Sequence, residues 1–209
     1  MKKIVDLRKR IGVVLARLQP IHNGHLALIE KAYNENDEVY VFIGSADKFN
    51  QRNPLPISLR LQLTNDAIKE TFKPHVHHMC DDTEEVVCGY QKIHVVPLDD
   101  LTDESDNSHD WGFYLYSKIV SETYNPNFTI YYSDGFEIIT TWFPSFLLRN
   151  NVSLALLARN ATVEGISATK IREYIMEEND EELKKYVPNC VFEMRKTIKQ
   201  HIELSKLIK

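Results

Sequence analysis

Apolar residues follow two alternating patterns along this chain, and together these patterns predict its fold. Short apolar runs rich in β-branched residues indicate buried strands at residues 10–16, 39–43, 93–98, 128–132 and 153–157. Between them, apolar positions recur every three or four residues and predict helices, over about 24–35 and 57–71. Strands that alternate with helices are typical of an α/β protein with a Rossmann-like parallel sheet and crossover helices.

The end of the chain has a different pattern. Residues 173–209 have the spacing of two or three amphipathic helices interrupted at Pro188, so a helical C-terminal segment follows the sheet. A hydrophobic content of 43% in 209 residues is ample for a core. Because no run of about 18 apolar residues occurs, we expect no membrane partner. The charged N-terminus also lacks the apolar stretch of a secretory signal.

Charge and cysteine content narrow the class of protein further. A net charge of −5 argues against an extended nucleic-acid surface, whereas a nucleotide pocket needs only local cations. The 3 cysteines suggest no disulfide framework, which fits the cytoplasm. Residues 75–92 are rich in histidine and cysteine, but their spacing matches no structural zinc template. We therefore expect a surface loop or a hairpin there rather than a metal site.

The stretch that joins the first strand to the first helix carries the strongest chemical signal. Residues 17–25 read R-L-Q-P-I-H-N-G-H, with Arg17, His22 and His25 close together in sequence. In an open α/β sheet, ligands bind at the carboxyl ends of the strands, where such a turn lies. The helix that begins there directs unpaired N–H groups and the positive end of its dipole at the ligand. This turn therefore predicts a phosphate-binding site.

A second turn near the end of the chain has similar properties. Residues 164–172 read E-G-I-S-A-T-K-I-R. Ser167 suits the N-cap of a helix, Thr169 lies in its first turn, and Arg172 is within reach of the same end. Hydroxyl, N–H and guanidinium groups in this arrangement can hold phosphate oxygens. Helix capping alone would explain Ser167 equally well.

Together the two turns resemble the H-x-G-H and I-S-x-T-x-I-R signatures of the nucleotidylyltransferase superfamily. Arg17, Gln19 and Pro20 at their offsets make the chain most similar to archaeal-type nicotinamide-nucleotide adenylyltransferases. The resemblance implies a single nucleotidylyltransferase domain over residues 10–209. A short extension at 1–9 and loop insertions at 75–92 and 99–110 are expected around that domain.

What the resemblance implies for function is adenylyl transfer from ATP to nicotinamide mononucleotide, with NAD and pyrophosphate as products. Mg2+ would bridge the leaving phosphates, and the family often forms homo-oligomers. The residues implied are His22, His25 and Arg172 in catalysis; Arg17, Gln19, Gly24, Ser167 and Thr169 at ATP; and Ser45, Arg60 and Trp111 at the mononucleotide. The resemblance assigns no residue as a resident metal ligand.

Two of these residues have simpler interpretations, and other functions remain open. Arg60 would otherwise be a solvated charge on an amphipathic helix, and Leu59 stands where the family has a glutamate. Trp111 would otherwise be a core residue beside Leu115 and Ile119. The alternatives in function are a cytidylyltransferase, a pantetheine-phosphate adenylyltransferase or a non-catalytic nucleotide sensor. The string E-G-I-S resembles the cytidylyltransferases in particular.

Overall fold

The computed structural model describes residues 8–78, 84–103, 106–133, 136–158 and 166–208. Most of the predicted N-terminal extension, Cys80 and the pair Glu164 and Gly165 lie outside the described residues. Within the described ranges, no helix combines the length and the apolar character needed to cross a membrane.

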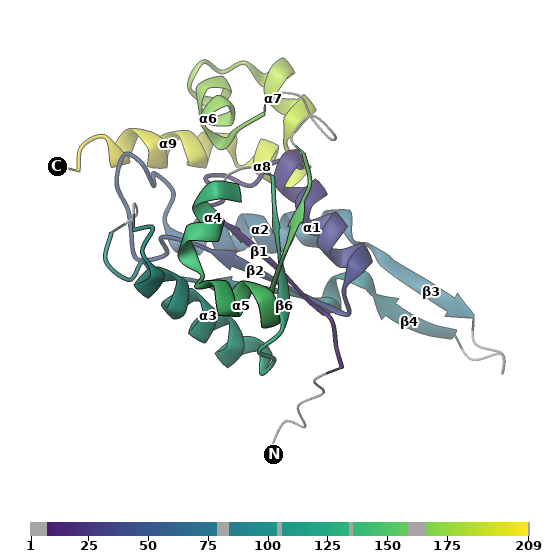
Figure 1. Cartoon of the computed structure of the whole chain (residues 1–209). Coiled ribbons are helices and arrows are strands. Elements are labelled where there is room, and N and C mark those ends of the chain that lie inside the picture. Colours follow the sequence, from purple (N-terminus) through teal and green to yellow (C-terminus); the bar gives the residue numbers. More distant parts are fainter. Residues whose placement is uncertain (1–7, 79–83, 104–105, 134–135, 159–165, 209) are drawn as a thin grey trace.

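A parallel sheet of five strands, in the order β5-β2-β1-β6-β7, forms the centre of the protein (Figure 1). The strand bounds are β1 Ile11–Ala16, β2 Glu38–Ile43, β5 Ile93–Pro97, β6 Phe128–Tyr132 and β7 Val152–Leu156. These strands confirm the predicted α/β fold. Because β2 lies on one side of β1 and β6 on the other, the chain changes direction across the sheet at β1. The carboxyl end of β1 is therefore the place where such sheets bind ligands.

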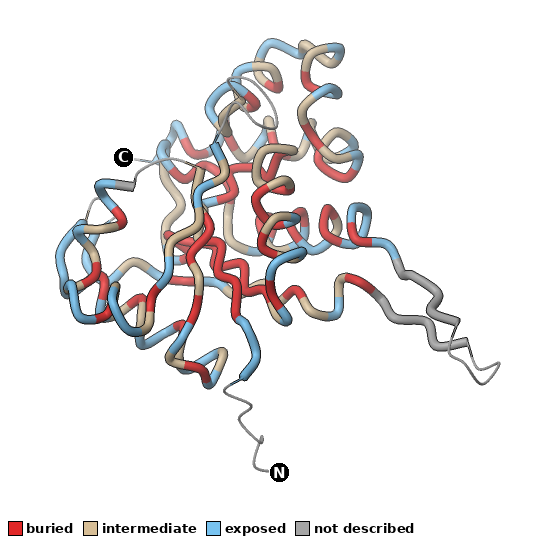
Figure 2. Tube along the Cα trace, turned by 45° about the vertical axis from the view of Figure 1, so that its right-hand side comes forward, coloured by how far each residue is buried: buried red, intermediate tan, exposed pale blue. Residues whose placement is uncertain are grey.

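Helices cover both faces of the sheet, as alternate side chains of the strands require. Val14 and Val41 belong to an apolar cluster with α1 (Asn23–Glu35) and α2 (Ile57–Thr71). Val13 and Phe42 belong to a second cluster on the opposite face. The helices there are α3 His109–Thr123, α4 Phe136–Trp142 and α5 Ser145–Asn150. Figure 2 shows buried residues running through the sheet and along the inward sides of the helices.

The C-terminal helices pack on the α1 and α2 side of the sheet. They are α6 Ala168–Met176, α7 Asp180–Tyr186, α8 Asn189–Glu193 and α9 Arg195–Ser205. Leu183, Val191 and Ile198 from these helices join the same cluster as α1 and α2. Pro188 stands at the N-cap of α8, so the predicted interruption of the C-terminal helices is confirmed.

A pair of antiparallel strands, at residues 74–78 and 84–88, projects from the sheet (Figure 1). The antiparallel strands β3 (Pro74–His78) and β4 (Glu84–Cys88) are followed by a short 3-10 helix, η1 (Gly89–Lys92). Of the two possibilities expected for this segment, a surface loop or a hairpin, the hairpin is confirmed.

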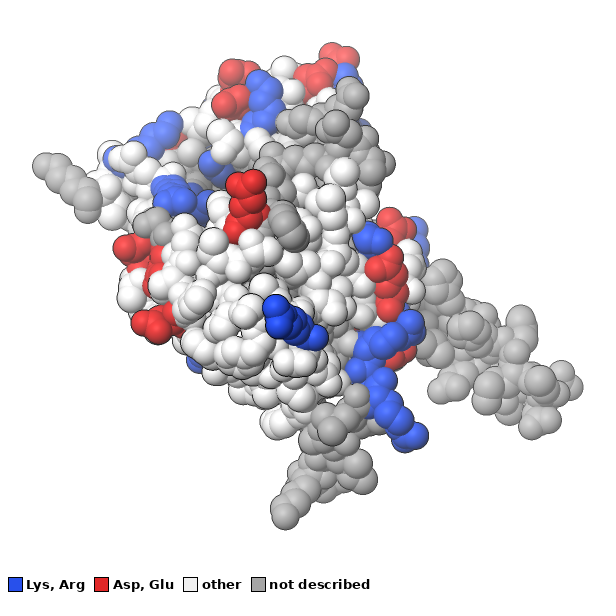
Figure 3. Space-filling model, viewed as in Figure 1, with Lys and Arg blue, Asp and Glu red and all other residues white. Residues whose placement is uncertain are grey.

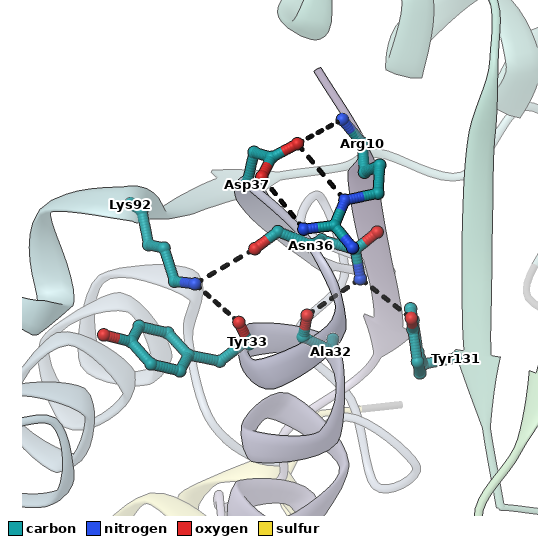
Figure 4. Close-up of polar contacts among 7 residues, drawn as sticks. All are labelled: Arg10, Ala32, Tyr33, Asn36, Asp37, Lys92 and Tyr131. Atoms are coloured by element: carbon teal, nitrogen blue, oxygen red, sulfur yellow. Dashed lines mark hydrogen bonds and ion pairs between the residues drawn. The ribbon is translucent and has the colours of Figure 1, made fainter. Parts of the chain in front are cut away.

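Polar contacts hold the end of α1 at the edge of the sheet opposite the carboxyl ends (Figure 4). Lys92 donates hydrogen bonds to the carbonyls of Tyr33, at 2.5 Å, and of Asn36, at 3.0 Å. Its ammonium also lies 3.7 Å from the centre of the Tyr33 ring. Nearby, the Arg10 guanidinium pairs with the carboxylate of Asp37 at 3.1 Å. A cation at the C-terminus of a helix satisfies carbonyls that lack intrahelical donors, so Lys92 stabilises α1.

The contact between α3 and α4 depends on a glycine. A Cβ atom added at Gly112 would lie 1.7 Å from the carbonyl oxygen of Trp142, which is backbone and cannot rotate away. We expect Gly112→Ala to lower the free energy of unfolding by about 1–3 kcal/mol, because α3 and α4 must separate. Denaturant unfolding measures this loss. At Gly44 the nearest atom to an added Cβ is 3.8 Å away. An equal loss in Gly44→Ala would contradict the steric explanation.

Candidate active site

The turn after β1 places two imidazole rings at the start of α1. His22 occupies the N-cap position and is 6% exposed, and His25 lies in the first turn of the helix. Their rings stack, with centroids 3.8 Å apart and planes at 29°. A Cβ atom at Gly24 would lie 3.1 Å from the His22 ring, which is tighter than most real contacts. Glycine at this position therefore allows the two rings to pack at the helix terminus.

The second predicted turn lies directly against the first. Arg172, on α6, donates a hydrogen bond to the carbonyl of Gln19 at 2.8 Å, across 153 positions of sequence. It donates a second to the hydroxyl of Thr169 at 3.1 Å. Ile166, just before α6, would be 3.3 Å from a Cβ at Gly24. The two turns that the sequence singled out therefore form one site at the carboxyl end of β1.

Positive charge is concentrated where the two turns meet. Burial lowers the pKa of Arg172, and the neighbouring charge of Arg17 lowers it further. Arg17 itself is exposed to solvent. Two guanidinium groups that repel each other are both stabilised when an anion binds between them. Ser167 accepts a hydrogen bond from the N–H of Lys170 at 3.2 Å, which makes it the N-cap of α6. The arrangement suits a polyphosphate.

Gln19, which the resemblance places at ATP, is buried against the loop before α2. It is 3% exposed, and its side-chain oxygen Oε1 accepts a hydrogen bond from the N–H of Leu55 at 2.9 Å. The side-chain amide faces Asn53 and the Leu55 carbonyl at 3.5 Å. These contacts fix the loop before α2 against the first turn, and the contact of Gln19 with ATP stays a prediction.

Arg60 is not the solvated charge of its simpler interpretation. Its side chain is fully buried, at 0% exposure, and burial lowers its pKa to about 10. The guanidinium donates to the carbonyls of Arg17 at 3.0 Å, Gly44 at 2.8 Å and Ser45 at 2.9 Å. Arg60 therefore ties the end of β1 to the end of β2. It supports the backbone beside the cavity, and its own contact with the mononucleotide stays a prediction.

A cavity of about 280 Å³ opens beside the two turns. Its lining includes Arg17, Ser45 and Trp111, which the sequence had placed in the site, and also Trp142 from α4. The two indoles meet edge to face, with centroids 6.3 Å apart and planes at 86°. Trp111 is only 7% exposed, so it is both a core residue and a wall of the cavity. An aromatic cavity at the small end of ligand sites suits one flat ring.

Sequence reasoning had missed Trp142 and the carboxylates of Asp103 and Asp106, which also line this cavity. Trp142 is one of only 2 tryptophans in the chain, and this rarity is the feature of the sequence that could have singled it out. No periodic pattern connected it to Trp111, because the two belong to different helices. Asp103 and Asp106 belong to an acidic stretch whose composition is typical of a solvated loop.

Comparison with known proteins agrees with this geometry. A sequence profile described as cytidylyltransferase-like matches residues 16–174. The chain belongs to this family. Its match runs from the end of β1 to α6, and so includes both turns. Curated relatives of this cytidylyltransferase-like chain are named nicotinamide-nucleotide adenylyltransferase. The one from Thermococcus onnurineus is 26% identical over 90% of this chain and 83% of its own length. The one from Thermococcus sibiricus is 28% identical over 90% of this chain and 84% of its own length.

Solved structures share the fold of this cytidylyltransferase-like chain. A Vibrio parahaemolyticus protein assigned as a nicotinate-nucleotide adenylyltransferase superposes with a TM-score of 0.59 at 18% identity. That superposition covers 90% of this chain and 98% of the other. A bifunctional NMN adenylyltransferase/ADP ribose pyrophosphatase from Francisella tularensis, complexed with AMP and a manganese ion, gives 0.55 at 19% identity. It covers 81% of this chain and 42% of that protein. The predicted resemblance is confirmed, and the chain is a nucleotidyltransferase.

Proposed function

We propose that this enzyme transfers the adenylyl group of ATP to nicotinamide mononucleotide and so makes NAD and pyrophosphate. The observation that carries the proposal is the junction of the two turns, where Arg172 reaches the backbone of the histidine turn at 2.8 Å. That junction suits a triphosphate, and the aromatic cavity beside it suits a nicotinamide ring. The names of the Thermococcus relatives support the same reaction.

The reaction needs no nucleophile from the protein. A phosphate oxygen of the mononucleotide attacks the α-phosphorus of ATP in line. The bond from that phosphorus to the bridging oxygen breaks, and pyrophosphate leaves with the electron pair. What the protein supplies is orientation of the two phosphates and stabilisation of the charge that develops on the oxygens. His22, His25 and Arg172 are the groups that we propose for this stabilisation.

The remaining residues of the site hold the substrates. Arg17 lies between the cavity and the junction of the turns, and we propose that it contacts phosphate oxygens. Gly24, Ser167 and Thr169 shape the ATP phosphate site, through close backbone approach and hydroxyl groups. Trp111 would stack on the nicotinamide ring, as an aromatic face does with a cationic ring.

Magnesium would enter with the nucleotide. Among the residues that the structure describes, no three His, Cys, Asp or Glu side chains form a metal-binding group. Mg2+ commonly binds through substrate phosphates and water with few protein ligands, which fits this donor set. When bound, the ion would neutralise charge on the leaving phosphates. The manganese ion in the Francisella structure supports use of a divalent cation.

We further propose that residues 10–209 act as one nucleotidyltransferase domain. The C-terminal helices share an apolar cluster with α1 and α2, which supports this boundary. Assembly into a homo-oligomer stays a prediction.

A substrate panel tests the proposed function. ATP and CTP are each combined with nicotinamide mononucleotide, nicotinate mononucleotide, phosphopantetheine and glycerol phosphate, and pyrophosphate release is measured. We expect release with ATP and a pyridine mononucleotide. Release only with CTP and glycerol phosphate would identify a cytidylyltransferase, and release only with phosphopantetheine would identify the other adenylyltransferase. Nucleotide binding without release from any pair would indicate a sensor.

A further inference from the structure

The cavity beside the two turns has an acidic wall. Asp100, Asp103 and Asp106 line it together with the two indoles. Figure 3 shows acidic side chains gathered at the left edge of the molecule, where the loop before α3 runs in Figure 1. This loop is one of the segments expected to be longer here than in the family. The proposed reaction leaves the charge of this loop unexplained.

Hydrogen bonds fix two of these carboxylates in the lining of the cavity. Asp106 accepts from the Ser108 N–H at 2.8 Å and from the Thr102 hydroxyl at 2.7 Å. These contacts hold the pKa of Asp106 below its usual range, Ser108 having the larger effect. Asp100 accepts from the hydroxyl of Ser45 at 3.1 Å. The wall is therefore negatively charged at neutral pH and is held in place by the loop.

The indoles are joined to the same loop. The N–H of the Trp142 ring donates to the side-chain oxygen of Asn107 at 3.3 Å. Asn107 directly follows Asp106, so the carboxylate and the ring edge are close along the wall. Arg17, also in the lining, supplies positive charge next to the junction of the two turns. The site is thus negative where Asp106 and Asn107 adjoin the indoles and positive at Arg17.

This polarity matches one of the two common pyridine mononucleotides better than the other. Both carry a cationic pyridinium ring and an anionic phosphate. The nicotinamide form has a neutral amide on the ring, whereas the nicotinate form has a carboxylate there. A fixed field of like charge disfavours a carboxylate brought into the cavity, and the same field attracts a cationic ring. The amide form therefore fits the charge at both ends of the site.

We infer that Asp100, Asp103 and Asp106 make this cavity selective for a pyridinium ring with an uncharged substituent and against the same ring with a carboxylate. The inference rests on the proposed function, because it assigns the cavity to the mononucleotide. It identifies the loop before α3 as the element that sets substrate choice. A metal site is a poor alternative for these carboxylates, since no metal-binding group is found among the described residues.

The experiment measures kcat/KM for both mononucleotides with ATP, and their binding by calorimetry. We expect the unaltered enzyme to prefer the nicotinamide form by about tenfold or more. In the double variant Asp103→Asn, Asp106→Asn, this ratio should fall by about tenfold, because asparagine keeps the shape and removes the charge. Each single variant should lower the ratio in the same direction. High salt should lower it in the unaltered enzyme, since the loop is partly exposed.

Asp110→Asn is the matched control, because Asp110 is exposed in the first turn of α3 and does not line the cavity. The ratio of kcat/KM for the two mononucleotides in Asp110→Asn should equal that of the unaltered enzyme. Equal use of both mononucleotides by the unaltered enzyme would overturn the inference and leave the proposed function standing. So would a ratio that the Asp103 and Asp106 variants leave unchanged. Pyrophosphate release with neither mononucleotide would overturn the proposed function, and the inference with it.

Discussion

His25→Ala should lower kcat by about 100- to 1000-fold while changing the KM for ATP much less. That is the usual cost of removing one donor that stabilises charge formed in a transition state. His25 lies in the first turn of α1, at the end of the helix where backbone N–H groups lack intrahelical partners. A donor aimed at developing charge contributes little to the ground state, so the loss appears in kcat. Steady-state rates of pyrophosphate release separate the two constants.

The stacking of His25 on His22, at 3.8 Å, adds a second expectation. Since the rings pack as one unit, the effects of the two substitutions should not be independent. The double variant His22→Ala, His25→Ala should lose less in kcat than the product of the two single fold-losses. His94→Ala is the control: this partly exposed histidine lies on β5, stacked on Tyr40 and away from the junction. Normal turnover in His25→Ala would remove the imidazole pair from the mechanism.

Arg60→Met should lower the free energy of unfolding by about 1–3 kcal/mol, the usual cost of leaving buried polar groups without their hydrogen-bond partner. Methionine fills similar space but leaves the carbonyls of Arg17, Gly44 and Ser45 without the donors that the guanidinium provides. Arg60→Lys should lower the free energy of unfolding by less than Arg60→Met does. Some loss remains, because one ammonium cannot reproduce the planar guanidinium. Denaturant unfolding with a constant m-value measures the loss.

The comparison for Arg60 is Arg149→Met. Arg149 is exposed on α5, and a substitution there should change stability by less than about 0.5 kcal/mol. A small loss in Arg60→Met, equal to that in Arg149→Met, would mean that water replaces the guanidinium. Activity gives a second measurement, because Arg60 binds the carbonyl of Ser45, a residue that lines the cavity. We expect KM for the mononucleotide to rise in Arg60→Met.

The sequence predicted the sheet and the two turns well, because both depend on local pattern. Buried parallel strands need continuous apolar runs, and helix N-termini need small, polar or glycine residues. Helices α4 and α5 were not predicted. The F-E-I-I-T-T-W run of α4 is short and rich in β-branched residues, so packing rather than propensity decides its structure. Proline then separates it from the equally short α5.

The direction of polar side chains was harder to predict than their location. Arg60 and Gln19 lie near the site as expected, but each faces backbone of a neighbouring loop. A sequence shows that a polar residue is present, not whether its partner is a ligand or a carbonyl. The same limit concealed the cavity wall. Trp111 and Trp142 become neighbours only because Gly112 allows α3 and α4 to touch.

Ser45 is held from two sides at the floor of the cavity. Its carbonyl accepts from Arg60 at 2.9 Å, its hydroxyl donates to Asp100 at 3.1 Å, and its φ of 50° is left-handed. A residue restrained in this way has little conformational entropy left to lose when a molecule settles above it. Pre-organisation of that kind lowers the entropic cost of association, and more of the contact energy remains as affinity. The enzyme thus completes this part of its binding surface while it folds.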